Sequence, residues 1–526
     1  MSATNNEATV APAPVQADVA GFYQLAVAYP DRAAVIRTDG AVLTFGQFGA
    51  RVNRISHALR AHGLRPGDVL AAIVHNGPEY LELILAAAQT GVIVVPVNWH
   101  LAVRELLYIV ADSGAGLVVA AAEQAAELPL DELPQHRYVI GGSAADWRPY
   151  AELGAGQPDS APEDRQAGGM MLYTSGTTGH PKGVHMTLPA IDPDVMAGFF
   201  AALPRGYGEV ATEGVHLVCS PMYHAAPGGH ALGFLHAGHT IVIQDRFEPE
   251  DMLRAVERYK VTTMHLVPTH FHRLLRLPDP IRSAVDLSSL QAVIHAGAPC
   301  PVAIKKQMLD WLGPIIWEYL GSTEGSVSRV SPQEWLARPG TVGRPLPGLT
   351  VKILGPDGEE LPAGEPGTIY FGYPGRSPAF EYHHDPQKTA AGRRGNLVTA
   401  GDFGYFDADG YLFLLDRRTD LIISGGVNIY PAEIEQHLIT HPAVQDVAVI
   451  GVPDPDWGQR VLAVVQPAPG ISAGDELAAE LLEHCRRELA SFKCPRRFEF
   501  VSDFPRTETG KVQRRVLRDA YTGQEG

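Results

Sequence analysis

The sequence predicts an α/β fold with a large N-terminal domain of stacked βαβ sheets, a small β-barrel-like subdomain and an α+β domain at the C-terminus. Two patterns support this prediction. Short β-branched runs alternate with amphipathic segments through much of the 526-residue chain, which is typical of parallel strands covered by helices. Beyond about residue 343, Gly and Pro separate shorter strand-like runs, so we expect the architecture to change there.

Two series of elements make up the expected α/β region. The first has strands at 69–74, 92–97 and 117–120, with helices at 78–89 and 102–112. The second has strands at 240–243, 262–267, 292–297 and 315–320, with helices at 249–259 and 301–312. Apolar strands separated by helices indicate parallel sheets that are covered on their faces.

The C-terminal third of the chain is expected to form two smaller structures. Strands at 350–354, 367–372 and 411–415 predict the β-rich subdomain. Helices at 431–439 and 475–489 and strands at 444–452, 461–466 and 496–501 predict the α+β domain. We therefore expect a flexible tail over 1–18, an N-terminal domain over 19–416 with its β-rich part at about 343–416, and a C-terminal domain over 417–526.

The charge balance argues against a nucleic acid partner. Lys and Arg total 42 against 59 Asp and Glu, which gives a formal net charge of −17. A surface with this balance repels a polyanion, so any nucleotide must be held by backbone N–H groups and a few local cations. The sequence therefore predicts a small, enclosed nucleotide site.

The cysteines and the N-terminus indicate a cytoplasmic protein. The first twenty residues lack the basic start and apolar stretch of a signal peptide. The apolar stretch 80–97 contains Glu82 and Pro96, which argues against a membrane span. Four scattered cysteines show no metal-binding spacing and suit reduced thiols: Cys219, Cys300, Cys485 and Cys494.

A loop between Tyr173 and Val184 has the composition of a phosphate-binding loop. It contains three glycines, four Ser or Thr hydroxyls and Lys182 within twelve residues. Glycines let backbone N–H groups face an anion, and hydroxyls and a lysine add donors and charge. A Walker A loop is excluded, because Pro181 precedes the lysine and Gly183 follows it. The candidate phosphate contacts are Thr174, Ser175, Gly176, Thr177, Thr178, Gly179 and Lys182.

This loop resembles the signature of the adenylate-forming superfamily, which includes acyl-CoA synthetases, aryl-CoA ligases, peptide-synthetase adenylation domains and luciferases. Further segments in the same order are similar to the adenine- and magnesium-binding turn (319–324), the ribose-binding segment (399–405), the hinge and thioester-forming motif (415–426) and the C-terminal lysine motif (505–511). The resemblance covers nearly the whole chain, and five motifs in order are more specific than any one of them.

The resemblance implies an acid–thiol ligase of the acyl-CoA synthetase type that uses ATP, Mg²⁺ and coenzyme A. A carboxylic acid and ATP would give acyl-AMP and pyrophosphate, and the CoA thiol would then give acyl-CoA and AMP. Glu324 would be the magnesium ligand, Asp402 and Arg417 would bind the ribose, and Lys511 would bridge the acid and the α-phosphate. The remaining expected nucleotide contacts are Ala298, Pro299, Glu318, Tyr319, Leu320, Gly321, Ser322 and Thr323.

The acid is expected to be hydrophobic, because pocket residues such as Gly228, Gly229, Val267 and Ala296 are small and apolar. They are compatible with an aryl, alicyclic, fatty, polyketide-derived or terpenoid-derived acid, and the sequence does not rank these classes. The expected pocket residues are His224, Thr269, His270, Ala296 and Gly297. A histidine at position 224 could also be an ordinary core residue bonded to a backbone carbonyl. The histidines of the chain show no ligand spacing typical of zinc.

Two positions depart from the family pattern. Leu320 stands where the family usually has an aromatic residue that stacks on adenine. Thr419 stands at the hinge, where the family usually has Asp or Lys. About this hinge the C-terminal domain is expected to move, bringing Gly425 and Gly426 beside the channel for CoA. The main alternative is adenylation alone, with the acyl group passed to a carrier protein or a second enzyme. A luciferase-like use and a non-catalytic nucleotide-binding module are more distant alternatives, and the resemblance also allows a homodimer.

Overall fold

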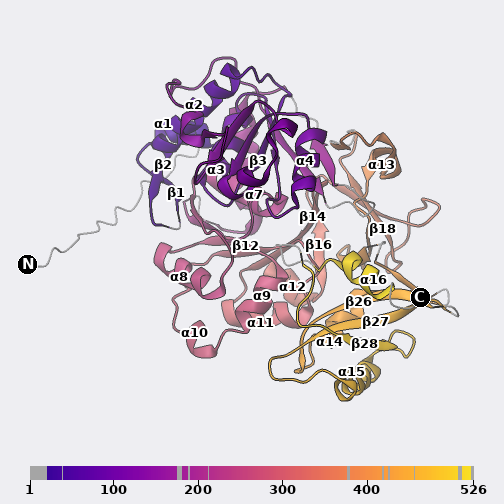
Figure 1. The fold of residues 1–526 in the computed structure, drawn as a ribbon. Helices are drawn as coiled ribbons and strands as arrows, with labels where there is room; N and C mark the ends of the chain where they lie inside the picture. Colours follow the sequence, from indigo (N-terminus) through magenta and orange to yellow (C-terminus); the bar gives the residue numbers. More distant parts are fainter. Residues whose placement is uncertain are drawn as a thin grey trace, which may run out of the picture. The chain divides into compact units, whose positions relative to one another are not determined.

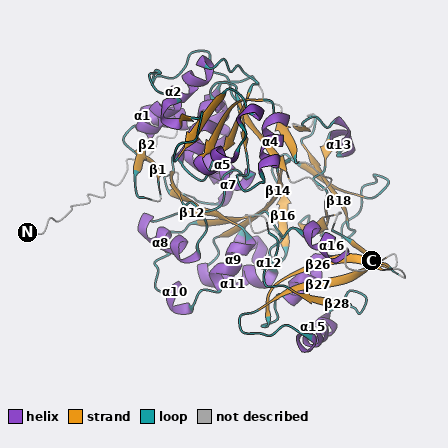
Figure 2. Cartoon of the chain, in the orientation of Figure 1, coloured by secondary structure: helices purple, strands orange, loops and turns teal. Residues whose placement is uncertain are grey.

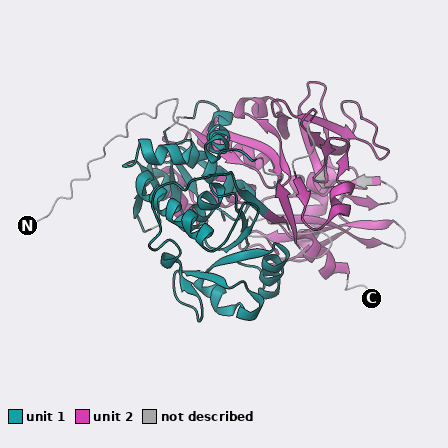
Figure 3. Ribbon diagram, turned by 90° about the horizontal axis from the view of Figure 1, so that it is seen from above, with its two compact units in different colours: residues 1–171, 188–246, 255–264 teal, residues 172–187, 247–254, 265–526 magenta. Residues whose placement is uncertain are grey.

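A computed structural model describes residues 21–37, 39–174, 181–186, 190–210, 213–375, 380–417, 420–424, 427–454, 457–506 and 512–522 (Figure 1). The chain forms two compact units, which are coloured separately in Figure 3. Unit 1 comprises residues 1–171, 188–246 and 255–264, and unit 2 comprises residues 172–187, 247–254 and 265–526. Helices and strands occur in both units (Figure 2).

Unit 1 contains the whole of the first predicted series. Its helices are α1 (Phe22–Ala28), α2 (Phe45–Ala61), α3 (Pro78–Ala88), α4 (Val103–Asp112), α5 (Ala122–Glu127), α6 (Pro193–Ala201) and α7 (Ala225–His236), with 3₁₀ turns at Leu130–Glu132, Tyr150–Glu152 and Leu203–Tyr207. Its strands are β1 (Ala33–Ile36), β2 (Val42–Thr44), β3 (Val69–Ile73), β4 (Ile93–Pro96), β5 (Ala115–Ala121), β6 (His136–Ile140), β7 (Arg148–Pro149), β10 (Val215–Val218) and β11 (Thr240–Ile243). Three elements span the limits of the units: β8 (Gly169–Thr174), α8 (Pro249–Tyr259) and β12 (Thr263–Leu266).

Two sets of parallel strands form the interior of unit 1. In the first set, β3 lies between β4 and β5, and β6 and β7 continue the sheet beyond β5. All five residues of β3 are buried, as expected for a central strand covered on both faces. In the second set, β11 lies between β1 and β10, and β2 pairs antiparallel with β1.

Unit 2 holds the β-rich region and the C-terminal α+β region. Its helices are α9 (Pro268–Leu275), α10 (Asp279–Ser283), α11 (Val302–Leu312), α12 (Pro332–Ala337), α13 (Pro386–Ala391), α14 (Pro431–Leu438), α15 (Asp475–Glu488) and α16 (Arg514–Thr522). Its strands are β9 (Lys182–Met186), β13 (Ala292–His295), β14 (Ile316–Ser322), β15 (Gly325–Val330), β16 (Thr341–Pro345), β17 (Thr350–Leu354), β18 (Gly367–Gly372), β19 (Phe380–Tyr382), β20 (Arg393–Arg394), β21 (Leu397–Val398), β22 (Asp402–Phe406), β23 (Leu412–Arg417), β24 (Ile422–Ser424), β25 (Val427–Ile429), β26 (Val444–Asp454), β27 (Gly458–Pro467) and β28 (Arg497–Phe500).

The predicted α/β fold class is confirmed, and many predicted elements have the expected bounds. The strands 240–243, 350–354 and 367–372 and the helix 249–259 form over the predicted residues. The prediction for the C-terminal region was too short, because β26 and β27 form one long antiparallel pair down to Asp454 and Gly458. The domain limits at 18, 343 and 416 stay predictions.

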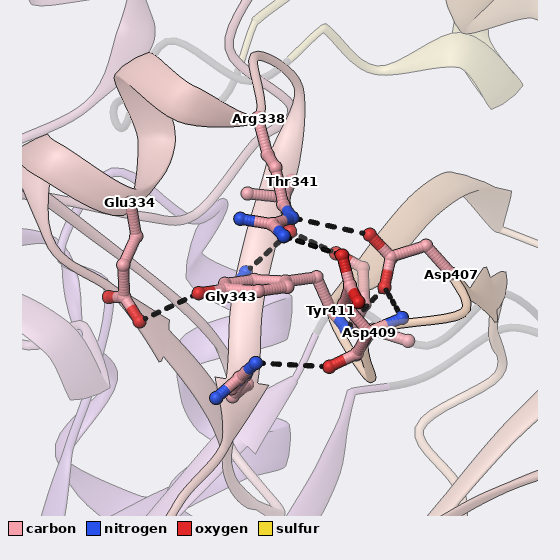
Figure 4. Close-up of polar contacts among 9 residues, drawn as sticks. Glu334, Arg338, Thr341, Gly343, Asp407, Asp409 and Tyr411 are labelled. Carbon is pink, nitrogen blue, oxygen red and sulfur yellow. Dashed lines mark hydrogen bonds and ion pairs between the residues drawn. The ribbon is translucent and has the colours of Figure 1, made fainter.

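A polar network in unit 2 links α12 and the residue that follows it to the turn between β22 and β23 (Figure 4). Arg338 contacts Asp409 at 2.5 Å and Asp407 at 3.6 Å, and its guanidinium lies 4.3 Å from the centre of the Tyr411 ring. The Tyr411 hydroxyl donates to Glu334 over 3.2 Å. These contacts connect the segment after α12 to the turn between β22 and β23.

Gly343 in β16 is part of the same region and has a positive φ of 94°. Its N–H donates to the Thr341 hydroxyl over 3.0 Å, and a β-carbon at this position would overlap the carbonyl oxygen of Arg329. We expect Gly343→Ala to lower the free energy of unfolding by about 2–3 kcal/mol, because both the backbone conformation and the packing resist a side chain. Urea unfolding of the two proteins measures the difference.

Gly348→Ala is the matched control, because Gly348 has a φ of 78° and no neighbour within 4 Å of the added β-carbon. It should cost about 1 kcal/mol, since only the backbone conformation is then unfavourable. Equal losses in the two variants would contradict the close approach to Arg329.

No helix in the described part of the chain combines the length and the apolar character needed to cross a bilayer.

Candidate active site

Many residues predicted to bind the substrates lie in unit 2, and some of them fall outside the described residues. Those outside are Ser175, Gly176, Thr177, Thr178, Gly179, Thr419, Gly425, Gly426 and Lys511. Their roles stay predictions. The described candidates of unit 2 come from β8 and β9, from α9, from the segment after β13, from β14 and the turn that follows it, and from β22 and β23. His224 lies in unit 1.

Lys182 is the first residue of β9 and is held by an ion pair. Its Nζ lies 3.3 Å from Oδ2 of Asp385, and both side chains are about a quarter exposed. The other carboxylate oxygen of Asp385 accepts the backbone N–H of Lys388 over 2.9 Å at the start of α13. The hydroxyl of Thr174 donates to the carbonyl of Lys182 over 3.4 Å, so the two ends of the predicted phosphate loop meet. The ammonium group of Lys182 is thus held by Asp385 at the start of β9.

Glu324 lies in the turn between β14 and β15. Its Oε1 accepts a hydrogen bond of 2.8 Å from the hydroxyl of Tyr382. The hydroxyl oxygen of Ser322 is buried in the same turn and has no hydrogen-bond partner among the described residues. Because Thr323 stands between these two residues, the turn concentrates oxygen ligands of the kind that a hard divalent cation prefers.

Glu318 forms a buried ionic cluster at the base of this turn. Its Oε2 lies 2.6 Å from Nζ of Lys305 and 3.4 Å from Nε2 of His295. Burial opposes ionisation of Glu318, but Lys305 and His295 outweigh it and lower the pKa of the carboxyl group to about 2. The Lys305 ammonium also lies 4.7 Å from the centre of the Trp335 ring. The carboxylate of Glu318 is therefore engaged with the protein, and its predicted contact with nucleotide stays a prediction.

Tyr319 and Leu320 have different surroundings on β14. Leu320 is 9% exposed and belongs to the apolar core that also contains Val327 and Phe371. The Tyr319 hydroxyl lies 3.4 Å from Nε2 of His265, and its ring edge would be 3.1 Å from a β-carbon on Gly321. This close approach gives a physical reason for glycine at 321.

The predicted acid-pocket residues of unit 2 come from α9 and from the end of β13. His270 is buried and stacks on Phe247 with ring centres 3.8 Å apart. Burial, with a smaller effect of Arg273, lowers the pKa of His270 to about 3, so this imidazole is neutral at physiological pH. Thr269 precedes it and is half-buried.

The segment after β13 turns sharply at Gly297, which has a φ of 88°. Ala296 is buried, Ala298 is half-buried, and Gly297 and Pro299 are exposed. A β-carbon on Gly297 would contact Val267 at 3.6 Å. An exposed turn with small side chains can bring its backbone close to a ligand.

His224 belongs to unit 1, where it precedes α7 as its N-cap residue. Burial lowers the pKa of His224 to about 4, so its ring is neutral near pH 7. The Nε2 atom is buried and has no hydrogen-bond partner among the described residues. A neutral ring with an unpaired nitrogen fits the predicted contact with an acid, which stays a prediction.

Asp402 begins β22 and is paired through the backbone with Arg417 at the end of β23. The antiparallel register therefore puts the two predicted ribose-binding residues opposite each other. The N–H of Gly401 donates to the hydroxyl of Thr399 over 3.0 Å, which fixes the turn that leads into Asp402.

Four residues of the site were missed in the sequence: Lys305, Tyr382, Asp385 and Lys388. Asp385 and Pro386 form a recognisable helix start, because an Asp cap followed by Pro is a common N-terminal signal. The other three have no comparable local signal, since their role depends on which distant side chains they meet.

Residues 22–379 match the AMP-binding enzyme family, and residues 433–511 match its C-terminal domain. The chain belongs to the AMP-binding enzyme family. This confirms the resemblance to adenylate-forming enzymes of the acyl-CoA ligase type that the sequence motifs indicate.

Three relatives of this AMP-binding enzyme show what it is similar to. Feruloyl-CoA synthase from an Amycolatopsis species is 36% identical over 500 residues, which cover 93% of this chain and 96% of that protein. The fatty acid–[acyl-carrier-protein] ligase ScoC from Streptomyces coeruleorubidus is 33% identical and covers 92% and 93%. The solved structure of o-succinylbenzoate CoA synthetase from Bacillus subtilis with its acyl-adenylate intermediate has a TM-score of 0.78 and 28% identity, and the match covers 95% and 98%.

Proposed function

We propose that this enzyme converts a hydrophobic carboxylic acid, with aryl-substituted acids as the leading class, into its CoA thioester through an acyl-adenylate. The similarity to feruloyl-CoA synthase supports the aryl class. The observation that carries the proposal is the network through Asp385, Lys388 and Tyr382, which connects Lys182 to Glu324. A cytoplasmic location, where ATP and CoA are both supplied, is part of this proposal.

The reaction needs charge to be stabilised on the triphosphate of bound ATP and on the α-phosphate as it is attacked. An oxygen of the acid attacks the α-phosphorus of ATP, the bond to the β-phosphate oxygen breaks, and pyrophosphate leaves. The thiol of CoA, after losing its proton, then attacks the acyl carbon, and AMP leaves. Lys182 would exchange its partner Asp385 for the triphosphate, and Lys511 would stabilise the charge that develops at the α-phosphate.

The oxygen donors of the β14–β15 turn fit a magnesium ion. Tyr382 bonds to one oxygen of Glu324, and within the described residues no hydrogen bond reaches the other. The unpartnered hydroxyl of Ser322 lies two residues earlier. The ion, when bound with ATP, would neutralise the phosphate charge. Glu324 would hold it, and Tyr382 would keep the carboxylate in place.

Pyrophosphate exchange into ATP tests the first half-reaction. In a panel of hydroxycinnamic, benzoic and fatty acids, exchange should be strongest with the aryl-substituted acids. Adding CoA should then release AMP and form a thioester, which mass spectrometry detects. Absence of exchange with every acid would refute adenylation, and exchange without a thioester would refute CoA as the acceptor.

The second candidate acceptor is the phosphopantetheine arm of an acyl carrier protein. The 33% identity with the carrier-protein ligase ScoC supports this alternative. CoA and a carrier protein present the same thiol, so the two acceptors differ in the surface that surrounds it. Parallel assays with CoA and with a loaded carrier protein would distinguish them by the product formed.

A further inference from the structure

The segment formed by β19 and α13 is fixed against the strand that carries Lys182. β19 pairs antiparallel with β9, and Tyr382 lies opposite Val184. The N–H of Tyr382 donates to the hydroxyl of Thr389 over 3.0 Å, and that hydroxyl donates to the carbonyl of Asp385 over 2.9 Å. The backbone of Tyr382 is therefore held from both sides.

The ring of Tyr382 is held as firmly as its backbone. It is 8% exposed, and the ring of Phe380 meets it edge-on with centres 5.6 Å apart. The ammonium of Lys388 lies 4.0 Å from the ring centre. Backbone and ring are thus both constrained, and the hydroxyl that they carry bonds to Glu324 over 2.8 Å.

We propose that Tyr382 is a positioning residue for adenylation, which fixes the carboxylate of Glu324 so that its other oxygen faces the cation of the bound nucleotide. The inference rests on the proposed function. A glutamate has three rotatable side-chain bonds, so an unanchored carboxylate at a turn must be ordered when the nucleotide binds. The hydroxyl of Tyr382 provides this order before binding.

Charge around Tyr382 supports a role beyond packing. The Lys388 ammonium interacts electrostatically with Glu324, Asp385 and Lys182, and burial lowers the pKa of Lys388 despite the two carboxylates. A tyrosine hydroxyl is neutral, so it can bond to Glu324 without cancelling the charge that a cation requires. An arginine or lysine at 382 would compete with the cation for the same oxygen.

Tyr382→Phe tests the proposal, because it removes the hydroxyl and keeps the ring. We expect the Mg²⁺ concentration for half-maximal pyrophosphate exchange to rise about tenfold, which is the loss expected for one hydrogen bond to a charged group. Calorimetry should show a similar loss in the affinity for ATP with Mg²⁺ and no change in the affinity for ATP without it. Thioester formation from supplied acyl-AMP should stay normal.

Tyr411→Phe is the matched control, since Tyr411 also donates to a glutamate in unit 2, at Glu334. It should leave the dependence on Mg²⁺ unchanged. A Tyr382→Phe variant that behaves like this control, while the wild-type enzyme performs exchange, would overturn the inference. Absence of exchange in the wild-type enzyme would instead refute the proposed function.

A double-mutant cycle with Glu324→Gln separates positioning from a structural effect. If Tyr382 acts through Glu324, adding Tyr382→Phe to Glu324→Gln should change ATP–Mg²⁺ affinity less than twofold. A further tenfold loss in the double variant would overturn the inference. Thermal unfolding of each protein identifies any variant that fails to fold, and Tyr382→Leu then offers a second variant that lacks the hydroxyl and is no larger than the native side chain.

Discussion

Lys511→Ala should lower the rate of acid-dependent pyrophosphate exchange by roughly 10²- to 10³-fold, the loss typical of removing one group that stabilises transition-state charge. Thioester formation from supplied acyl-AMP should change little, because the lysine is assigned to the first half-reaction only. Exchange and thioester formation are measured separately in rapid-quench assays.

Arg515→Ala is the control for this prediction. Arg515 is an exposed cation four residues further along, and its partner Asp519 lies on the same helix. Its loss should leave both half-reactions near the wild-type rates. Equal effects of Lys511→Ala on the two half-reactions would contradict its assignment to adenylation, and a normal exchange rate would exclude any catalytic role.

Lys305→Met should lower the free energy of unfolding by about 3–5 kcal/mol, the usual cost of leaving one partner of a buried ion pair unpaired. Lys305 is fully buried at 2.6 Å from Glu318, and methionine keeps its volume without its charge. Urea unfolding at pH 7 measures the loss. Lys306→Met, a change at the exposed neighbouring residue, should have little effect.

The double variant Lys305→Met with Glu318→Gln should recover much of the lost stability, because no charge then stays buried without a partner. If Lys305→Met were as stable as Lys306→Met, the ion pair would contribute nothing to folding. If the double variant were less stable than Lys305→Met alone, Glu318 would be stabilised by other groups.

The same pair predicts how stability depends on pH. The pKa of Glu318 is lowered from 4.5 to about 2, so its contribution is complete above pH 4.5 and disappears as the pH falls through 2. Burial lowers the pKa of His295 below 6.5, so the unfolded chain binds that proton first and stability also falls below pH 6.5. Because the contribution of Glu318 is lost in that range, the difference in unfolding free energy between wild type and Lys305→Met should shrink between pH 4.5 and 2.

The sequence was sufficient to predict the fold class and the family, because both depend on patterns along the chain. β-Branched residues at 240–243 and a strong helical pattern at 249–259 determine those elements locally. The motif containing Glu324 indicates its chemistry without a structure. The long pair formed by β26 and β27 was underestimated, since polar residues near Asp454 carry no strand signal but are held by the partner strand.

Side-chain partners could not be predicted in the same way. A lysine at 305 on an amphipathic helix is normally exposed, and its burial depends on Glu318 meeting it from β14. Tyr382 follows a similar rule, because an aromatic residue on a short strand predicts packing, whereas its hydroxyl bond depends on a turn 58 residues away. Patterns of hydrophobicity do not encode such pairings.

The burial of Leu320 limits how this enzyme can change by mutation. Its side chain packs with Val327 and Phe371 in the apolar core of unit 2. An aromatic residue at 320 would have to enlarge that core, which usually costs about 1–3 kcal/mol. Tolerance of an aromatic residue at 320 should therefore increase when a neighbour such as Phe371 is made smaller. Core packing in unit 2, as well as nucleotide binding, thus limits which residues can stand at 320.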